Sequence, residues 1–114
     1  MYSNELVRGM LRTIILQMLE EKGKMYGYEL SKVVKDRTEE KIVLTEGALY
    51  PLLHKLEKDE LVTTSLETVG NRTRKYYALT KQGTTSAKEK KSELLDFMRT
   101  LKVLMDPKQI ALCL

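Results

Sequence analysis

The sequence has little or none of several residue types that mark particular classes of protein. Its 114 residues include one cysteine, one histidine and no tryptophan. A single cysteine cannot form a disulfide within the chain, so a reducing cytoplasm is the natural setting. The histidine, His54, has no cysteine or second histidine at metal-ligand spacing nearby. We therefore expect no metal site and no cofactor.

Long apolar stretches are also missing. No segment approaches the roughly 20 apolar residues that a membrane-spanning helix requires. Charged residues interrupt every apolar run within residues 1–20, so no secretory signal is expected. These features predict a soluble, cytoplasmic protein without a membrane partner.

Recognisable catalytic motifs are absent as well. The sequence contains no glycine-rich phosphate loop and no nucleophile elbow. Cys113 has no basic partner in the sequence that would favour its reactive thiolate form. We expect no catalytic residues, and a small enzyme using His54 is a rival hypothesis with little support.

The charges that are present are unevenly distributed. Lysine and arginine number 20 against 16 acidic residues, for a net charge of +4. This total alone does not indicate a nucleic-acid partner. Between residues 70 and 91, however, only one acid accompanies seven basic residues, at positions 72, 74, 75, 81, 88, 90 and 91. This segment favours a polyanionic partner.

The spacing of apolar residues predicts two helices in the first third of the chain, over residues 4–21 and 26–37. Ser3 or Asn4 can cap the first helix, and Gly23 marks its end. The first helix carries two adjacent apolar rows, a stripe wider than a single packing neighbour requires. It can therefore lie at the centre of the core, face a second subunit, or do both.

Residues 45–57 predict a third helix with two different faces. One face collects four leucines at helical spacing: Leu49, Leu52, Leu53 and Leu56. The opposite face carries Gly47, Tyr50, Pro51, His54 and Lys58. Thr45 is the expected N-cap, worth about 1 kcal/mol. Pro51 either bends this helix or begins it, with residues 45–50 forming a separate turn.

Alternating side chains in residues 61–66 and 74–79 predict two antiparallel strands. The turn-forming residues 69–72 separate them, which predicts a hairpin with a loop longer than two residues. Arg72, Arg74 and Lys75 then lie at the turn or just after it. A two-faced helix beside a positive ribbon matches what the DNA major groove and its flanking phosphates require. The pattern predicts a winged helix-turn-helix that binds double-stranded DNA.

The predicted DNA contacts come from the third helix and the hairpin: Thr45, Gly47, Tyr50, Pro51, His54, Lys55, Arg72, Arg74 and Lys75. Each has a simpler structural alternative. His54 can be a surface histidine without a role, Tyr50 can cover the rim of the core, and the charged hairpin can merely be solvated. Gly47 costs about 1 kcal/mol relative to alanine inside a helix, so it should permit close approach of DNA or of a neighbouring helix.

Residues 81–105 predict a long last helix that follows Thr80 and ends before residues 106–107. Its second half carries an apolar stripe that should form an interface. The predicted dimer contacts are Leu6, Met10, Ile14, Leu94, Met98, Leu101 and Met105. The alternative is packing on the first helix of the same chain. The predicted fold class is mainly α with a small β-hairpin, as a winged-helix domain at residues 1–80 and a dimerisation helix with a tail at residues 81–114, in one compact unit.

Four blocks of this sequence, within roughly residues 5–83, resemble the PadR family of bacterial transcriptional regulators. They are Tyr26-Gly27-Tyr28-Glu29-Leu30, the run from Glu46 to Leu53, Leu56-Glu57 with Leu61-Val62, and the run from Arg74 to Thr80 with Gly83. The short C-terminal region is similar to that of the smaller PadR subfamily. The resemblance implies a winged-helix homodimer that binds inverted-repeat operators, mostly as a repressor.

The resemblance also implies that a small phenolic or drug-like effector can release the DNA. In small drug-responsive members, an aromatic-rich cavity between the first and last helices holds the ligand at the dimer interface. The corresponding positions here are mainly aliphatic and methionine, so a drug sandwiched between aromatic rings is not expected. A methionine-lined pocket for a small apolar effector and the absence of any effector both stay open. A winged helix that contacts only proteins is the alternative function.

Overall fold

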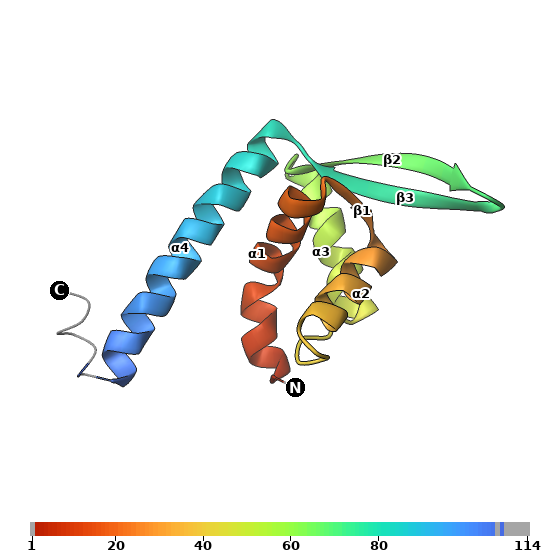
Figure 1. Cartoon of the computed structure of the whole chain (residues 1–114). Coiled ribbons are helices and arrows are strands. Elements are labelled where there is room, and N and C mark those ends of the chain that lie inside the picture. Colours follow the sequence, from red (N-terminus) through yellow and green to blue (C-terminus); the bar gives the residue numbers. More distant parts are fainter. Residues whose placement is uncertain (1, 107, 109–114) are drawn as a thin grey trace.

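The computed structural model describes residues 2–106 and residue 108, and Cys113 lies outside this part of the chain. Seven elements follow one another along the chain (Figure 1). They are α1 (Asn4–Lys22), β1 (Lys24–Tyr26), α2 (Gly27–Arg37), α3 (Glu46–Lys58), β2 (Val62–Val69), β3 (Arg72–Leu79) and α4 (Lys81–Met105). The fold is mainly helical with a small antiparallel sheet, which confirms the predicted fold class.

The first helix, α1, begins and ends as its sequence predicts. The Ser3 hydroxyl accepts a hydrogen bond from the Leu6 N–H at 3.3 Å and so satisfies one of the free donors at the helix start. Gly23 ends the helix at φ 90°, and its N–H donates to the Leu19 carbonyl at 2.9 Å. Ile15 and Leu16 are completely buried, so α1 is a central helix of the core.

Strand β1 is an element that the sequence did not predict. Its three residues pair with β3, with Met25 opposite Tyr77 and Tyr26 opposite Tyr76, and the sheet order is β1-β3-β2. A three-residue strand is too short to show alternation. Tyr26 was assigned to the second helix, but its backbone is extended and only precedes α2. Its N–H donates to the Glu29 carboxylate at 3.4 Å.

The hairpin of β2 and β3 extends away from the helices as a long ribbon, hereafter the wing (Figure 1). The predicted loop length is wrong, because Val69 pairs with Arg72 and leaves a loop of only Gly70 and Asn71. Gly70 has φ 64°, and a positive φ at the first loop residue alone is what a type II′ turn requires. The strands continue beyond the alternating segment because exposed polar residues also pair across the ribbon.

Helix α3 is continuous from Glu46 to Lys58, with Pro51 inside it. The alternative in which Pro51 begins the helix is therefore wrong. Thr45 occupies the N-cap position, but its side chain makes no capping hydrogen bond. Its carbonyl instead accepts from the N–H groups of Ala48 and Leu49 at 3.1 and 2.9 Å. Because Pro51 has no N–H, the Gly47 carbonyl lacks the partner that an ordinary helix would give it.

Hydrogen bonds attach the start of α4 to the rest of the protein. The Thr80 hydroxyl accepts from the Gly83 N–H at 3.0 Å and donates to the Glu60 carbonyl at 2.7 Å. The Gln17 side chain of α1 donates to the Ala87 carbonyl at 2.6 Å. Farther along, α4 diverges from the other helices (Figure 1), and its apolar residues become exposed. The last helix thus packs on α1 of its own chain at its start, whereas Leu104 and Met105 at its end are largely exposed.

Gly83 is required where α4 meets the residue before β2, because a Cβ there would overlap the Leu61 carbonyl oxygen. We predict that Gly83→Ala lowers the free energy of unfolding by about 1–3 kcal/mol, the usual cost of forcing an extra methyl into a packed site. Gly47→Ala is the matched control, since a Cβ there would have no neighbour within 4 Å. It should keep or raise stability, by up to about 1 kcal/mol. Chemical denaturation measures both, and equal stabilities would contradict the close packing.

Candidate nucleic-acid interface

The two faces of α3 lie in different environments, as its sequence predicts. Leu49, Leu53 and Leu56 are at most 1% exposed and pack in the core. The predicted contact residues of this helix and its N-cap are all exposed: Thr45, Gly47, Tyr50, Pro51, His54 and Lys55. A shallow groove runs along this face between Tyr50 and Lys58. Because its leucine face packs in the core, the helix exposes the opposite face, with the predicted contact residues, to solvent.

Two arginines that were not among the predicted contacts lie beside this surface. Arg8 and Arg12 of α1 line a second groove together with Thr45, Gly47 and Lys55. Arg12 is 3.4 Å from the Asp59 carboxylate, so part of its charge is compensated. Arg8 and Arg12 are four residues apart, so they lie on the same face of α1. The sequence prediction considered only the apolar rows of this helix, and this spacing was the signal that could have identified the two arginines.

Gly47 and Tyr50 are explained differently by the structure. The space around Gly47 is open, so among the described residues no neighbouring helix requires a glycine there. Tyr50 lies across the start of α2, because a Cβ on Gly27 would overlap its ring and hydroxyl. It nevertheless remains 43% exposed. Tyr50 thus covers the rim of the core and also stays accessible from outside.

The outer face of the wing carries a connected set of cations and aromatic rings. Arg74 lies over the Tyr26 ring, 4.5 Å from its centroid, and Tyr26 meets Tyr76 edge to face at 5.4 Å. Lys24 lies 5.2 Å from the Tyr76 centroid and pairs with Glu67. The hydrogen bond that Lys24 donates to the Glu67 carboxylate raises the pKa of Lys24 above its usual value. These contacts hold the Arg74 side chain against Tyr26 of β1.

Lys75 points to the opposite face of the wing from Arg74. Its Nζ lies 3.6 Å from a carboxylate oxygen of Glu57 in the last turn of α3, and 5.6 Å from the Tyr77 ring centroid. Burial raises the pKa of the Tyr77 hydroxyl. The three predicted cations of the wing are therefore not equivalent, because Lys75 already has a carboxylate partner.

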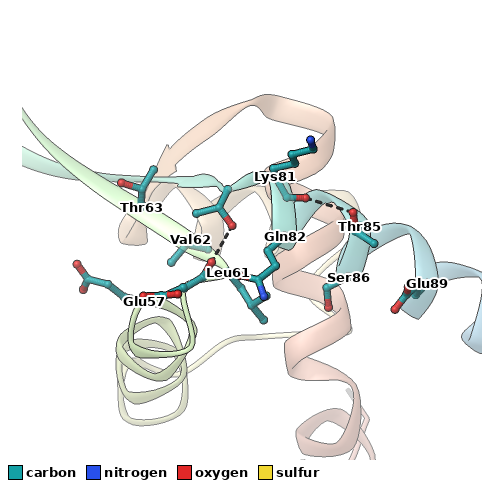
Figure 2. Close-up of a pocket in the computed structure, with 11 residues that line it drawn as sticks. Glu57, Leu61, Val62, Thr63, Lys81, Gln82, Thr85, Ser86 and Glu89 are labelled. Carbon is teal, nitrogen blue, oxygen red and sulfur yellow. Dashed lines mark hydrogen bonds between the residues drawn. The ribbon is translucent and has the colours of Figure 1, made fainter.

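An acidic hollow lies at one end of α3, between the start of β2 and the first turns of α4 (Figure 2). Glu57, Glu60 and Glu89 line it, with Lys81 as the cation among the lining residues. Carboxylates repel phosphate groups, so this hollow limits the positive surface on that side. Among residues 2–106 and 108, no cluster of histidine, cysteine or acidic residues is arranged to hold a metal ion.

The predicted dimer residues fall on the two helices that diverge. Leu6, Met98 and Met105 are 60%, 47% and 76% exposed. The remaining ones are half-buried: Met10, Ile14, Leu94 and Leu101. A groove between α1 and α4 is lined in part by Met10, Leu94 and Phe97. Within the described part of the chain, no helix is apolar enough over sufficient length to cross a membrane.

Comparison with known proteins gives a consistent result. The profile of the transcriptional regulator PadR-like family matches residues 15–89. A transcriptional regulator from Clostridium thermocellum has a similar structure, with a TM-score of 0.79, 32% identity, and coverage of 90% of this chain and 96% of that one. A protein of Lysinibacillus sphaericus is 31% identical over 93% of this chain and 97% of its own length.

A second similar structure is that of Bacillus subtilis PadR in complex with operator DNA. It has a TM-score of 0.62 and 26% identity, and the match covers 69% of this chain and 45% of that one. The chain belongs to the PadR-like family of transcriptional regulators. It is accordingly a DNA-binding regulator with a winged-helix fold rather than an enzyme, as the sequence predicts.

Proposed function

We propose that this regulator represses transcription as a homodimer that binds an inverted-repeat operator. The main support is the exposed face of α3, which is backed by three buried leucines. In this proposal α3 is the recognition helix. Two copies would enter successive major grooves about 34 Å apart on one face of the DNA. Occlusion of a promoter in the cytoplasm is the expected effect.

The proposed base and backbone contacts of α3 are Thr45, Gly47, Tyr50, Pro51, His54 and Lys55, with Arg72 and Arg74 from the wing. His54 can donate to a base edge or a phosphate from its exposed position. Arg72 and Arg74 lie on the same face of β3, since their positions differ by two residues. They are suited to flanking phosphates or to the minor groove, while Lys75 is already paired with Glu57.

DNA binding should depend strongly on salt. Titration of the DNA upstream of this gene between about 50 and 200 mM salt should show a steep fall in affinity, because each neutralised phosphate releases counterions. Arg72→Ala with Arg74→Ala should reduce the log–log slope by about 1.8 per protomer, at about 0.9 per phosphate contact. A flat salt response, or a double variant that regulates normally without DNA affinity, would instead favour a winged helix that contacts only proteins.

Gly47 allows a separate test of how closely the backbone of α3 approaches DNA. Gly47→Ala should keep or increase the stability of the free protein, because helix propensity rises and the site is open. Its affinity for the operator should nevertheless fall, because the methyl group would stand on the proposed contact surface. Thr85→Ala in α4 is the control for a change in helix propensity alone. Unchanged operator affinity of Gly47→Ala would remove Gly47 from the interface.

A homodimer would cover the apolar residues that α4 exposes. We assign Leu94, Met98, Leu101 and Met105 to contacts with the partner's α1, including Leu6, Met10 and Ile14. Leu104, at 70% exposed, extends the same apolar end of the helix. The groove beside Met10, Leu94 and Phe97 is the position that we propose for a small apolar effector. Methionine can adapt its shape to such ligands.

Substitution of Met98 tests the dimer directly. Met98→Glu should give a folded monomer, because this side chain is 47% exposed within its own chain but would be buried against the partner. Operator affinity should then fall by about a hundredfold or more, since the two half-sites would be bound independently. Ser92→Glu adds the same charge at an exposed position of α4 and is the control. Sedimentation that shows an unchanged dimer for Met98→Glu would contradict this interface.

A further inference from the structure

A single carboxylate joins α3 to both strands of the wing. One oxygen of Glu57 accepts a hydrogen bond from the Thr64 hydroxyl of β2 at 3.0 Å. The other lies 3.6 Å from the Lys75 ammonium of β3. Glu57 belongs to the last turn of α3, at the edge of the acidic hollow nearest to β2 and on the far side from Glu89 (Figure 2). Three elements therefore meet at one acidic side chain.

This link lies where the apolar attachment of the wing ends. Val62 and Tyr77 are 3% and 5% exposed and anchor the base of the two strands in the core. Farther out on the same face, Leu66 is opposite Lys75 and is 72% exposed. Of the two contacts of Glu57, Thr64 is opposite Tyr77 at the level of the buried anchors, and Lys75 lies two residues farther out along β3. Lys75 is adjacent in sequence to Arg74.

Charge alone does not explain an acidic residue at this position. Glu57 follows the proposed contact residues of α3, and a carboxylate close to DNA weakens binding by repulsion. Its pairing with Lys75 also compensates a cation that was expected to contact phosphate. A benefit of Glu57 that offsets this electrostatic cost must therefore come from the position in which its contacts with Thr64 and Lys75 hold the wing.

We propose that Glu57 is a positioning residue for DNA binding, which fixes the wing relative to the recognition helix and commits Lys75 to that link. The inference rests on the DNA-binding function proposed above. Base contacts by α3 and phosphate contacts by Arg72 and Arg74 must be made together on one rigid duplex. If the wing is already held at a fixed distance from α3, both sets of contacts form without the entropic cost of ordering a mobile wing on binding.

The test compares operator affinity and its salt slope for Glu57→Ala and Glu89→Ala. Both variants remove one negative charge from the same hollow. For Glu89 the structure records no ion pair within residues 2–106 and 108. Glu89→Ala should bind as tightly as the wild type or more tightly. Glu57→Ala should bind about three- to tenfold more weakly, with a slope smaller by about 0.9 per protomer because a loosened wing loses a phosphate contact.

Two milder variants keep the test decisive if Glu57→Ala folds poorly. Thr64→Val removes the hydrogen bond without changing charge, and should weaken binding while the unfolding temperature changes little. Glu57→Gln keeps an acceptor for Thr64 and loses only the ion pair, so its affinity should lie between those of Glu57→Ala and the wild type. A purely structural role would lower the unfolding temperature without changing the salt slope of the folded protein.

The inference is overturned if all three variants bind as tightly as Glu89→Ala with the slope of the wild type. Steep, salt-dependent binding by the wild type together with that outcome would leave the proposed DNA-binding function intact. Absence of operator binding by the wild type itself would instead reject the proposed function. The two failures are therefore distinguishable in one set of titrations.

Discussion

The burial of one face of α3 determines what the opposite face can do. Leu49, Leu53 and Leu56 are almost completely buried, and each contributes about 1.5–3 kcal/mol. Against them stand Gly47 and Pro51, which cost about 1 and about 3 kcal/mol inside a helix. The apolar contacts outweigh these costs, so the helix stays continuous through Pro51. Residues unfavourable to a helix can therefore occupy its exposed surface, where their chemistry serves binding.

The sequence was sufficient for this part of the fold because the relevant signals are periodic. Leucines at helical spacing defined the two faces of α3, and alternation placed Tyr77 and Arg74 on opposite faces of β3. Strand β1 was missed because three residues cannot establish a period. The loop at Gly70 was predicted too long because polar residues such as Thr68 and Thr73 pair without an apolar pattern. The role of Gly83 also depends on a contact with Leu61, which spacing along the chain cannot show.

The contact residues were harder to predict than the fold, because sequence gives the charge of a side chain but not its partner. Lys75 and Arg74 are neighbours in the chain, yet one pairs with Glu57 and the other lies over the ring of Tyr26. Arg8 was not predicted as a contact because the apolar rows of its helix, α1, were the only feature of that helix that was interpreted. Only the folded chain places it in the groove beside Gly47. The assignment of charged residues to a DNA surface therefore needs the tertiary arrangement.

The wing is held on both of its faces, and this explains how a ribbon with little apolar packing can have a defined direction. On the outer face, Lys24 pairs with Glu67 and Arg74 lies over Tyr26. On the inner face, Glu57 contacts both strands. Exposed ion pairs individually contribute little to stability. Because the contacts lie on opposite faces, however, displacement of the wing in either direction breaks at least one of them. Positional restraint of this kind requires modest contacts in the right places rather than a large contribution to stability.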